Sequence, residues 1–319
     1  MSSQPTLSAS ALPTPPAHRK VVTEVTGVFS LPWQIARDEG LFAAEGVEVE
    51  FRQAPSSIET RFPATDLDYI EDHRLVPALA GHTELEAKKV DVYRACEWGQ
   101  VRRSQDSGHG RIISKRSAVV SQAIFSAPGS RFTHPQTLAN ERVAVRFHHG
   151  SHYAALQSLE GFLKPEEIRL VHLSHVDGYE AVRRGDIAAV TLMEPWITLA
   201  EKEGFQRIIE THYQGSEIAS PDVDPETWAA VHRAVKVATD RLKADKKKYL
   251  HYLIAALPEQ YRDLISEDDF HLPRLLFVDP APYDEKEFQQ TYDWLVGWGL
   301  IAPDSDFTDL VDNRVRAAA

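Results

Sequence analysis

Residues 31–51 read LPWQIARDEGLFAAEGVEVEF and follow a short β-type run, VVTEV, at residues 21–25. Pro32 falls in the first turn of a helix, where its missing N–H costs no hydrogen bond. Gly40 is typical of a helix end. After it, residues 47–51 alternate apolar and acidic side chains, as in a strand with one solvated face. The stretch therefore predicts a strand, a helix and a second strand.

The composition is that of an ordinary globular protein. The chain has 319 residues, of which 43% are hydrophobic and 26% are charged, and this length predicts two lobes or domains. The net charge of −12 argues against nucleic acid and against anionic membrane surfaces as partners. The sequence has no apolar run of about 18 residues, so no membrane insertion is expected. With Cys96 as the single cysteine, an intramolecular disulfide is excluded.

Residues 1–20 are rich in Ser, Pro, Thr and Ala. They have neither the basic start nor the apolar centre of an export signal, so we expect a disordered tail and a cytoplasmic protein. If a signal peptide has been removed from the natural chain, the expected location is periplasmic.

Short apolar runs alternate with helical segments between residues 90 and 210, including strands at 119–125 and 206–210. This alternation indicates an α/β fold with parallel sheets. The polar stretch 100–111 is predicted to be a loop, and the chain after Pro225 is mainly helical. We predict two lobes with a cleft between them. One lobe comprises residues 21–117 plus 213–319, and the other comprises residues 118–212.

Three further motifs follow in order: Gly150-Ser151 at a helix start, GDIAA at residues 185–189, and Glu194-Pro195. With residues 21–51 they resemble the type II periplasmic-binding-protein fold over roughly residues 21–312. The sulfonate/nitrate/taurine and thiamine-pyrimidine-precursor group is the most similar branch. The resemblance implies two lobes that hold one small ligand. It includes solute-binding proteins of ABC importers and cytosolic enzymes such as the biphenyl-sulfinate desulfinase.

The segment Gly150-Ser151-His152 opens a predicted helix. Free N–H groups and the helix dipole at such an end favour a carboxylate, sulfonate or phosphate. We predict that these three residues face the cleft and bind the polar end of the ligand. Ser151 has an alternative role as an ordinary helix N-cap, and Arg94 and Arg146 are candidates to balance an anion.

Chemistry, if it occurs, is assigned to His148 and His149 as proton carriers, because imidazole titrates near neutral pH. Cys96 ends a predicted strand and is either a nucleophile or an inert apolar wall. The desulfinase carries its cysteine in the first-strand loop, but residues 26–30 read TGVFS and have none. The histidine spacing does not predict a metal site, and no cofactor is expected.

Five other residues are candidate ligand contacts. Aromatic side chains supply apolar walls for a ring or an alkyl chain, and core packing is an equal alternative for Trp33. Glu194 occupies the family position near the cleft, where the carboxylate contacts the ligand or the hinge. The five are Phe29, Trp33, Glu97, Trp98 and Glu194.

Two functions remain open. The absent export signal favours a cytosolic enzyme of lyase or hydrolase type that binds a small anionic or heteroaromatic molecule. The absence of a recognised catalytic set favours the substrate-binding protein of an ABC importer for a sulfonate, an organic acid or a pyrimidine-like compound. An ABC permease is the expected partner in the second case. The fold alone does not decide between them.

Overall fold

The computed structural model describes residues 19–25, 27–53, 84–107 and 109–314. The predicted tail lies outside them except for residues 19 and 20, which begin the first strand. Residues 73–82, where the apolar Leu75, Val76 and Leu79 predict a short helix, also lie outside the described part of the chain.

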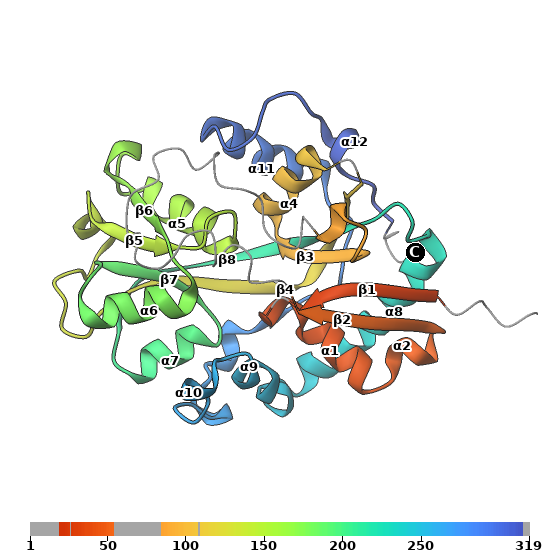
Figure 1. Ribbon diagram of the computed structural model, residues 1–319, viewed down its shortest axis with the longest axis horizontal. Helices are drawn as coiled ribbons and strands as arrows, with labels where there is room; N and C mark the ends of the chain where they lie inside the picture. The colour runs from red at the N-terminus through yellow and green to blue at the C-terminus, as the bar shows by residue number, and fades with distance from the viewer. Residues whose placement is uncertain (1–18, 26, 54–83, 108, 315–319) are drawn as a thin grey trace, which may run out of the picture.

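The described residues form one nine-stranded sheet in the order β2-β1-β3-β8-β4-β7-β5-β6, and β9 pairs with β4 (Figure 1). The strands are β1 (Arg19–Val25), β2 (Val47–Gln53), β3 (Val92–Cys96), β4 (Arg111–Ser126), β5 (Arg142–Val145), β6 (Arg169–His172), β7 (Ala189–Met193), β8 (Gln206–Ala219) and β9 (Leu276–Phe277).

Helices cover both faces of this sheet (Figure 1). The α-helices are α1 (Leu31–Asp38), α2 (Leu41–Ala44), α4 (Glu97–Asp106), α5 (Gly150–Glu160), α6 (His175–Arg184), α7 (Trp196–Lys202), α8 (Pro225–Ala244), α9 (His251–Ala255), α10 (Glu259–Arg262), α11 (Glu285–Gly297) and α12 (Phe307–Leu310). A 3₁₀ turn, η1 (Gly27–Ser30), precedes α1. In the described part of the chain, no helix has the length and apolar character needed to cross a membrane.

The start of the fold follows the predicted pattern. Pro32 lies in the first turn of α1. Gly40 has a left-handed backbone with φ of 71°, which separates α1 from α2. Strand β2 then pairs in parallel with β1, from Arg19↔Val47 to Val25↔Gln53. The sequence therefore predicted this βαβ unit correctly.

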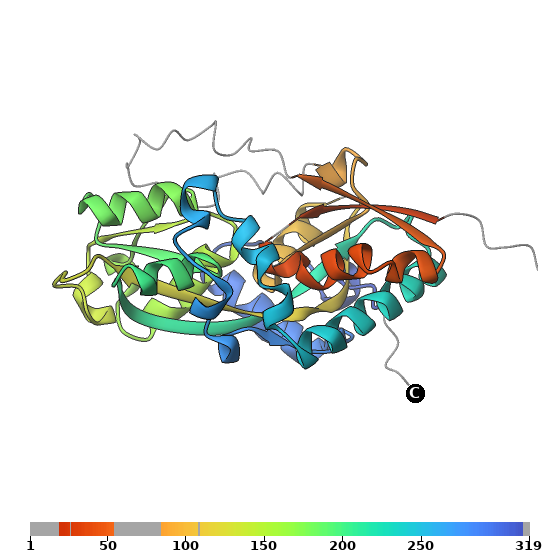
Figure 2. The same cartoon turned by 90° about the horizontal axis from the view of Figure 1, so that it is seen from below.

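Two long antiparallel strands, β4 and β8, join the two halves of the molecule (Figures 1 and 2). The first half holds β1, β2 and β3 with α1, α2, α4 and α8. The second half holds β5, β6 and β7 with α5, α6 and α7. Since β4 and β8 run through both halves, the hydrogen-bonded ladder is continuous rather than divided into separate parallel sheets. The expected strands at 119–125 and 206–210 are the parts of β4 and β8 that lie in the second half.

Helix α4 replaces most of the loop predicted over residues 100–111. Several of its polar side chains are buried and form hydrogen bonds inside the protein, so composition was misleading here. Gln100 Nε2 donates to Tyr93 O at 2.9 Å. Arg103 Nη2 donates to His148 O at 3.0 Å.

A segment that we call the strap, residues 247–275, contacts both halves. On the first half, the Tyr252 hydroxyl donates to Asp38 Oδ2 at 2.6 Å. On the second half, the Tyr261 hydroxyl donates to Glu180 Oε1 at 2.6 Å. Figure 2 shows the strap, in light blue with α9 and α10, lying across the middle of the molecule.

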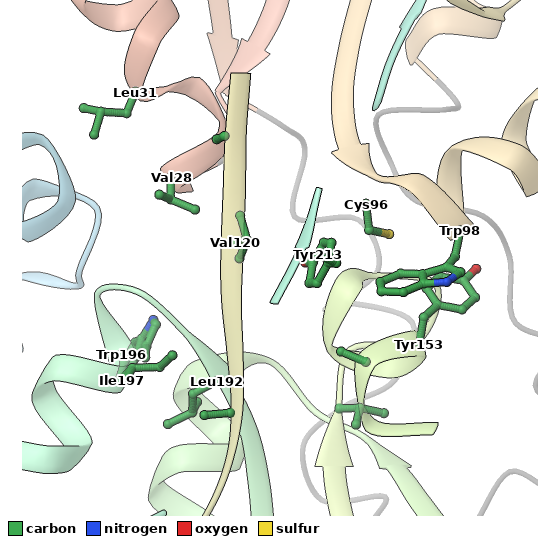
Figure 3. Packing of buried hydrophobic residues seen from close by; sticks show 14 of the residues in the cluster. Val28, Leu31, Cys96, Trp98, Val120, Tyr153, Leu192, Trp196, Ile197 and Tyr213 are labelled. Carbon is green, nitrogen blue, oxygen red and sulfur yellow. The ribbon is translucent and has the colours of Figure 1, made fainter. Parts of the chain in front are cut away.

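The hydrophobic core also extends across the two halves (Figure 3). Val120 on β4, Val28 of the first half and Leu192 of the second half belong to the same buried cluster. Trp98 of α4 stacks on Tyr153 of α5 with ring centroids 5.9 Å apart. The halves are therefore packed on each other where the crossing strands join them.

Candidate functional site

A cavity of about 650 Å³ lies between the halves. It is lined by η1, α1, the end of β3, the turn before α5, the β7–α7 junction, and residues of the strap. The lining residues that carry the chemistry are Phe29, Cys96, Arg146, His149, His175 and Glu194.

The charge of this lining is opposite to that of the chain. Among the described residues, its arginines are Arg94, Arg146 and Arg262, and its one carboxylate is Glu194. That carboxylate already binds Arg274, with Nη1 and Oε1 3.0 Å apart. A net charge of −12 therefore coexists with a cavity whose described lining carries more positive than negative side chains.

The turn before α5 is fixed by its own side chains. His148 has a left-handed backbone with φ of 61°. The Arg146 N–H donates to Ser151 Oγ at 2.9 Å, and the His148 N–H donates to His152 Nδ1 at 3.2 Å. Ser151 and His152 are buried and do not line the cavity. The structure thus gives both side chains a place in shaping the turn.

Gly150, by contrast, lines the cavity. A Cβ at this position would overlap the Tyr213 hydroxyl and would lie 2.7 Å from Tyr213 Cζ. Only glycine allows the start of α5 to lie this close to β8.

Two imidazoles beside this turn face the cavity. His149 Nε2 and His175 Nε2 are buried and have no hydrogen-bond partner among the residues that the structure describes. Burial holds the pKa of His149 well below its usual range, and nearby Arg146 lowers it further. Burial and Arg146 together lower the pKa of His175 to about 3. Both rings are neutral near pH 7, and a neutral imidazole donates one N–H.

His148 is placed differently from His149. Its ring is 1% exposed and does not line the cavity. Arg102 Nη1 lies 2.8 Å from His148 Nδ1, and the Tyr153 hydroxyl lies 3.4 Å from the same atom. Of the two predicted proton carriers, the structure therefore brings His149 to the cleft.

Cys96 is the last residue of β3 and lines the cavity (Figure 3). It is 1% exposed, and burial raises the pKa of its thiol. The next two predicted site residues turn away from the cavity. The Glu97 carboxylate lies 3.7 Å from Lys115 Nζ and accepts from the Thr291 hydroxyl at 3.3 Å. Trp98 belongs to the core.

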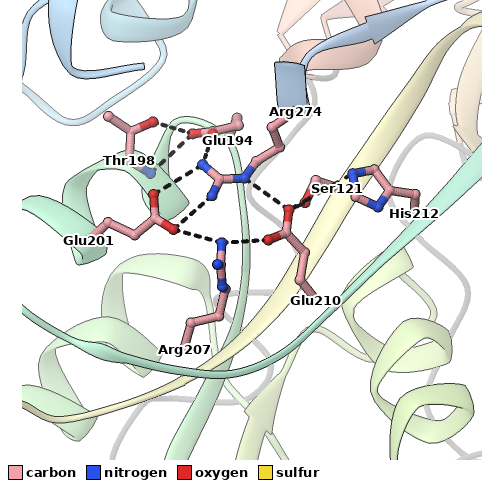
Figure 4. A network of polar contacts seen from close by, with 8 residues as sticks. All are labelled: Ser121, Glu194, Thr198, Glu201, Arg207, Glu210, His212 and Arg274. Atoms are coloured by element: carbon pink, nitrogen blue, oxygen red, sulfur yellow. Dashed lines mark hydrogen bonds and ion pairs between the residues drawn. The ribbon is translucent and has the colours of Figure 1, made fainter. Parts of the chain in front are cut away.

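Trp33 and Glu194 complete the predicted set. Trp33 Nε1 donates to Glu217 Oε1 at 3.2 Å, and the ring is buried in the core rather than at the cavity. Glu194 lines the cavity and accepts from the Thr198 hydroxyl at 2.7 Å (Figure 4). Burial raises the pKa of Glu194, although Thr198 and Arg274 oppose the rise.

Sequence reasoning missed five polar residues of the lining, which are Gln34, Tyr93, His175, Tyr252 and Arg262. His175 follows β6 at its carboxyl end, so the rule that singled out Cys96 would have found it. Tyr252 and Arg262 come from the strap and carry no local signal. Within the described residues, no group of three or more His, Cys, Asp or Glu side chains is placed to hold a metal ion.

Neither a protein-family model nor a curated protein sequence matches the chain. Solved structures do. The alkanesulfonate-binding protein SsuA from Xanthomonas axonopodis pv. citri, bound to MOPS, has a TM-score of 0.70 at 13% identity, covering 94% of this chain and 99% of its own. SsuA from Escherichia coli has a TM-score of 0.69 at 13% identity, with coverages of 96% and 95%.

The desulfurization enzyme DSZB has a TM-score of 0.60 at 14% identity, covering 93% of this chain and 97% of its own. At such low identities the likeness shows a shared fold, and proteins with one fold can have many different functions. A Candida albicans gene product described as having the generic periplasmic-binding-protein fold matches with a TM-score of 0.69 at 14% identity over 95% of this chain and 99% of its own. The chain therefore has the two-lobed α/β fold of the periplasmic binding proteins, in the form that sulfonate-binding proteins and a desulfurization enzyme also have.

Proposed function

We propose that this protein binds a small organic anion in the cleft between its halves. The observation that carries the proposal is the set of polar residues that line the cavity. Arg146 and the neutral rings of His149 and His175 line it, and the one lining carboxylate among the described residues is paired with Arg274. Arginine and N–H donors bind carboxylate and sulfonate groups.

The size and the apolar side of the cavity indicate that the ligand has an organic body. About 650 Å³ is within the range of cavities that enclose small organic molecules. Phe29, Met193 and Trp196 supply apolar lining. MOPS, the ligand in one SsuA structure, is an organic molecule with a sulfonate group, which supports a sulfonate or carboxylate as the anionic group here.

We propose, as the finer function, the substrate-binding component of an ABC importer. The likeness to SsuA proteins supports it. In that role the protein acts outside the cytoplasmic membrane, and an ABC permease is its partner.

The second candidate is a cytosolic enzyme of lyase or hydrolase type. The observation that favours it is that Cys96 and His149 line the same cavity, and the fold of DSZB supports it. Against it, burial raises the pKa of the Cys96 thiol, which disfavours the thiolate that would attack a substrate.

We also place the boundary between the lobes inside β4 and β8, with residues 21–117 and 213–319 in one lobe and 118–212 in the other. The pairing of β4 with β8 shifts register between Lys115 and Val119, close to this boundary. Limited proteolysis or hydrogen exchange tests this boundary. If the least protected residues of β4 lie away from the register shift between Lys115 and Val119, the placement is wrong.

The test of binding is calorimetry with matched ligands. MOPS, benzenesulfonate and benzoate are compared with benzamide, which is neutral. We expect the anions to bind at least about tenfold more tightly than benzamide, and we expect added salt to weaken them. Equal affinity for benzamide and benzoate would refute the proposal.

Mass spectrometry of the same mixtures after incubation separates the two candidates. Unchanged ligand supports the binding protein, and a new product supports the enzyme. If product forms, Cys96→Ser should abolish turnover when the sulfur is the nucleophile, whereas Cys96→Ala should be nearly harmless when it is a wall. His149→Ala tests the proton carrier in the same assay.

A further inference from the structure

Arg116 lies behind the cavity wall in an irregular part of β4. The register passes from Lys115↔Ser216 to Val119↔Gln214, so residues 116–118 lie opposite Gly215 alone. Such a bulge re-aims a side chain. Arg116 is 1% exposed, and its Cζ lies 3.3 Å from the centroid of the Phe29 ring. Phe29 in turn lines the cavity.

The guanidinium of Arg116 is unusual among the buried arginines. Within the part of the chain that the structure describes, none of its three nitrogens has a partner at hydrogen-bond distance, and the phenol of Tyr213 is the polar group that acts on it most strongly. The buried guanidinium of Arg103, in contrast, donates to Gln100 Oε1 and to His148 O. Arg274 binds three carboxylates.

Among the described residues, no acid forms an ion pair or a hydrogen bond with this charge. Glu217 and Glu97 act on Arg116 over a longer distance. Glu217 accepts hydrogen bonds from Trp33 and Ser114, and Glu97 faces Lys115. Burial lowers the pKa of Arg116 to about 10, so the group remains charged near pH 7. A buried charge without a partner costs several kcal/mol of stability.

The absence of a side chain at Gly215 leaves space for the guanidinium of Arg116. A Cβ at position 215 would lie 2.5 Å from Arg116 Cζ and would overlap Ala95 O. The ring of Tyr213 lies 5.8 Å from the same Cζ. Because a Cβ at Gly150 would overlap the Tyr213 hydroxyl, Arg116 lies near the start of α5 as well as behind Phe29.

We propose that Arg116 is a specificity-determining residue of the cleft, and that its uncompensated charge behind Phe29 is the counter-charge for the anionic group of the ligand. The inference rests on the proposed binding of an organic anion. It assigns to the ligand a sulfonate or carboxylate at the pole of the cavity formed by Phe29 and the start of α5. Binding supplies the negative charge that the described residues do not place there.

The test is Arg116→Met, which keeps the length of the stem and removes the charge, with Arg116→Lys as the conservative variant. The thermal midpoint is measured without ligand, and the affinity for MOPS, benzenesulfonate and benzoate is measured by calorimetry. We expect Arg116→Met to leave the midpoint unchanged or to raise it, and to weaken the anions by about tenfold or more. Arg116→Lys should retain affinity within about threefold.

Arg103→Met is the matched control for the midpoint, because it removes a buried arginine that has partners. It should lower the midpoint. Retained anion affinity in Arg116→Met overturns the proposal, and so does a lower midpoint in that variant comparable to that of Arg103→Met, because Arg116 would then be a structural residue. If the wild-type protein binds none of the three anions, the proposed function itself fails, and this outcome is distinct from the other two.

Discussion

Replacing Arg274 with methionine should lower the free energy of unfolding by about 3–5 kcal/mol, the usual loss when one partner of a buried ion pair is removed. The side chain of Arg274 is 3% exposed. Its nitrogens lie 3.0 Å from Glu194 Oε1, 2.7 Å from Glu201 Oε1 and 2.9 Å from Glu210 Oε1 (Figure 4). Methionine fills the space of the stem but leaves the buried Glu194 carboxylate with Thr198 alone among these partners.

Arg207→Met is the matched control, because Arg207 binds two of the same carboxylates from a more exposed position. Its Nη1 lies 3.0 Å from Glu201 Oε1 and 2.6 Å from Glu210 Oε2, and its side chain is 44% exposed. We expect a loss below about 1 kcal/mol for this variant. Urea unfolding followed by tryptophan fluorescence measures both. In thermal unfolding, Arg274→Met should lower the midpoint by about 5–15 °C. Equal losses in the two variants would refute the reasoning that burial sets the energy of this network.

The loss in Arg274→Met should also depend on pH. Burial raises the pKa of Glu194 and Arg274 opposes the rise, so removal of the arginine raises this pKa further. A folded-state pKa above the unfolded value stabilises the protein at low pH, and that stability is lost as the pH rises through the folded pKa. The difference in the free energy of unfolding between wild type and Arg274→Met should therefore be smaller at about pH 5 than at about pH 8. A loss that is larger at the lower pH would contradict this assignment.

Two further predictions concern a glycine of the cleft and two buried histidines. Gly150→Ala should lower the thermal midpoint and weaken anion binding by more than about tenfold, because its Cβ would overlap the Tyr213 hydroxyl; Gly161→Ala, which meets open space, should change neither. The pKa of His172 is lowered to about 4 and that of His175 to about 3, mainly by burial, so their stabilisation is present above the unfolded pKa of about 6.5 and is lost as the pH falls. Wild type should lose free energy of unfolding between about pH 7 and about pH 5, and urea unfolding at the two pH values measures this loss. Replacing either histidine with Asn should make the loss smaller by about 2 kcal/mol.

Local sequence signals predicted the parts of the fold that local chemistry determines. Pro32 and Gly40 marked the first helix because each has a restricted or special backbone. The full lengths of β4 and β8 could not be predicted, because they follow from pairing between segments far apart in the chain. Helix α4 was missed because its buried polar side chains find partners that only the folded chain supplies.

The same distinction holds for the site. Phe29, Cys96, His149, Gly150 and Glu194 were predicted and line the cavity, although their roles stay predictions. Five other predicted residues lie next to these in the sequence and do not line it, since successive side chains of a strand end or a helix start point in different directions. These neighbours are Glu97, Trp98, His148, Ser151 and His152, and Trp33 also lies in the core.

The pairing of β4 with β8 makes the second half an insertion in topological terms. Val119 and Gln214, at the boundary between the halves, are register partners, so the chain leaves the first half and returns to it on adjacent strands. The residues between them, including Arg146 and His149, form one continuous segment that joins the first half at two adjacent strands. We call this segment the cassette. Exchange of the cassette between related chains would replace all the cavity residues of the second half at once. The incoming cassette would have to bring its own acids for Arg274, because the strap that carries this arginine stays behind with the host.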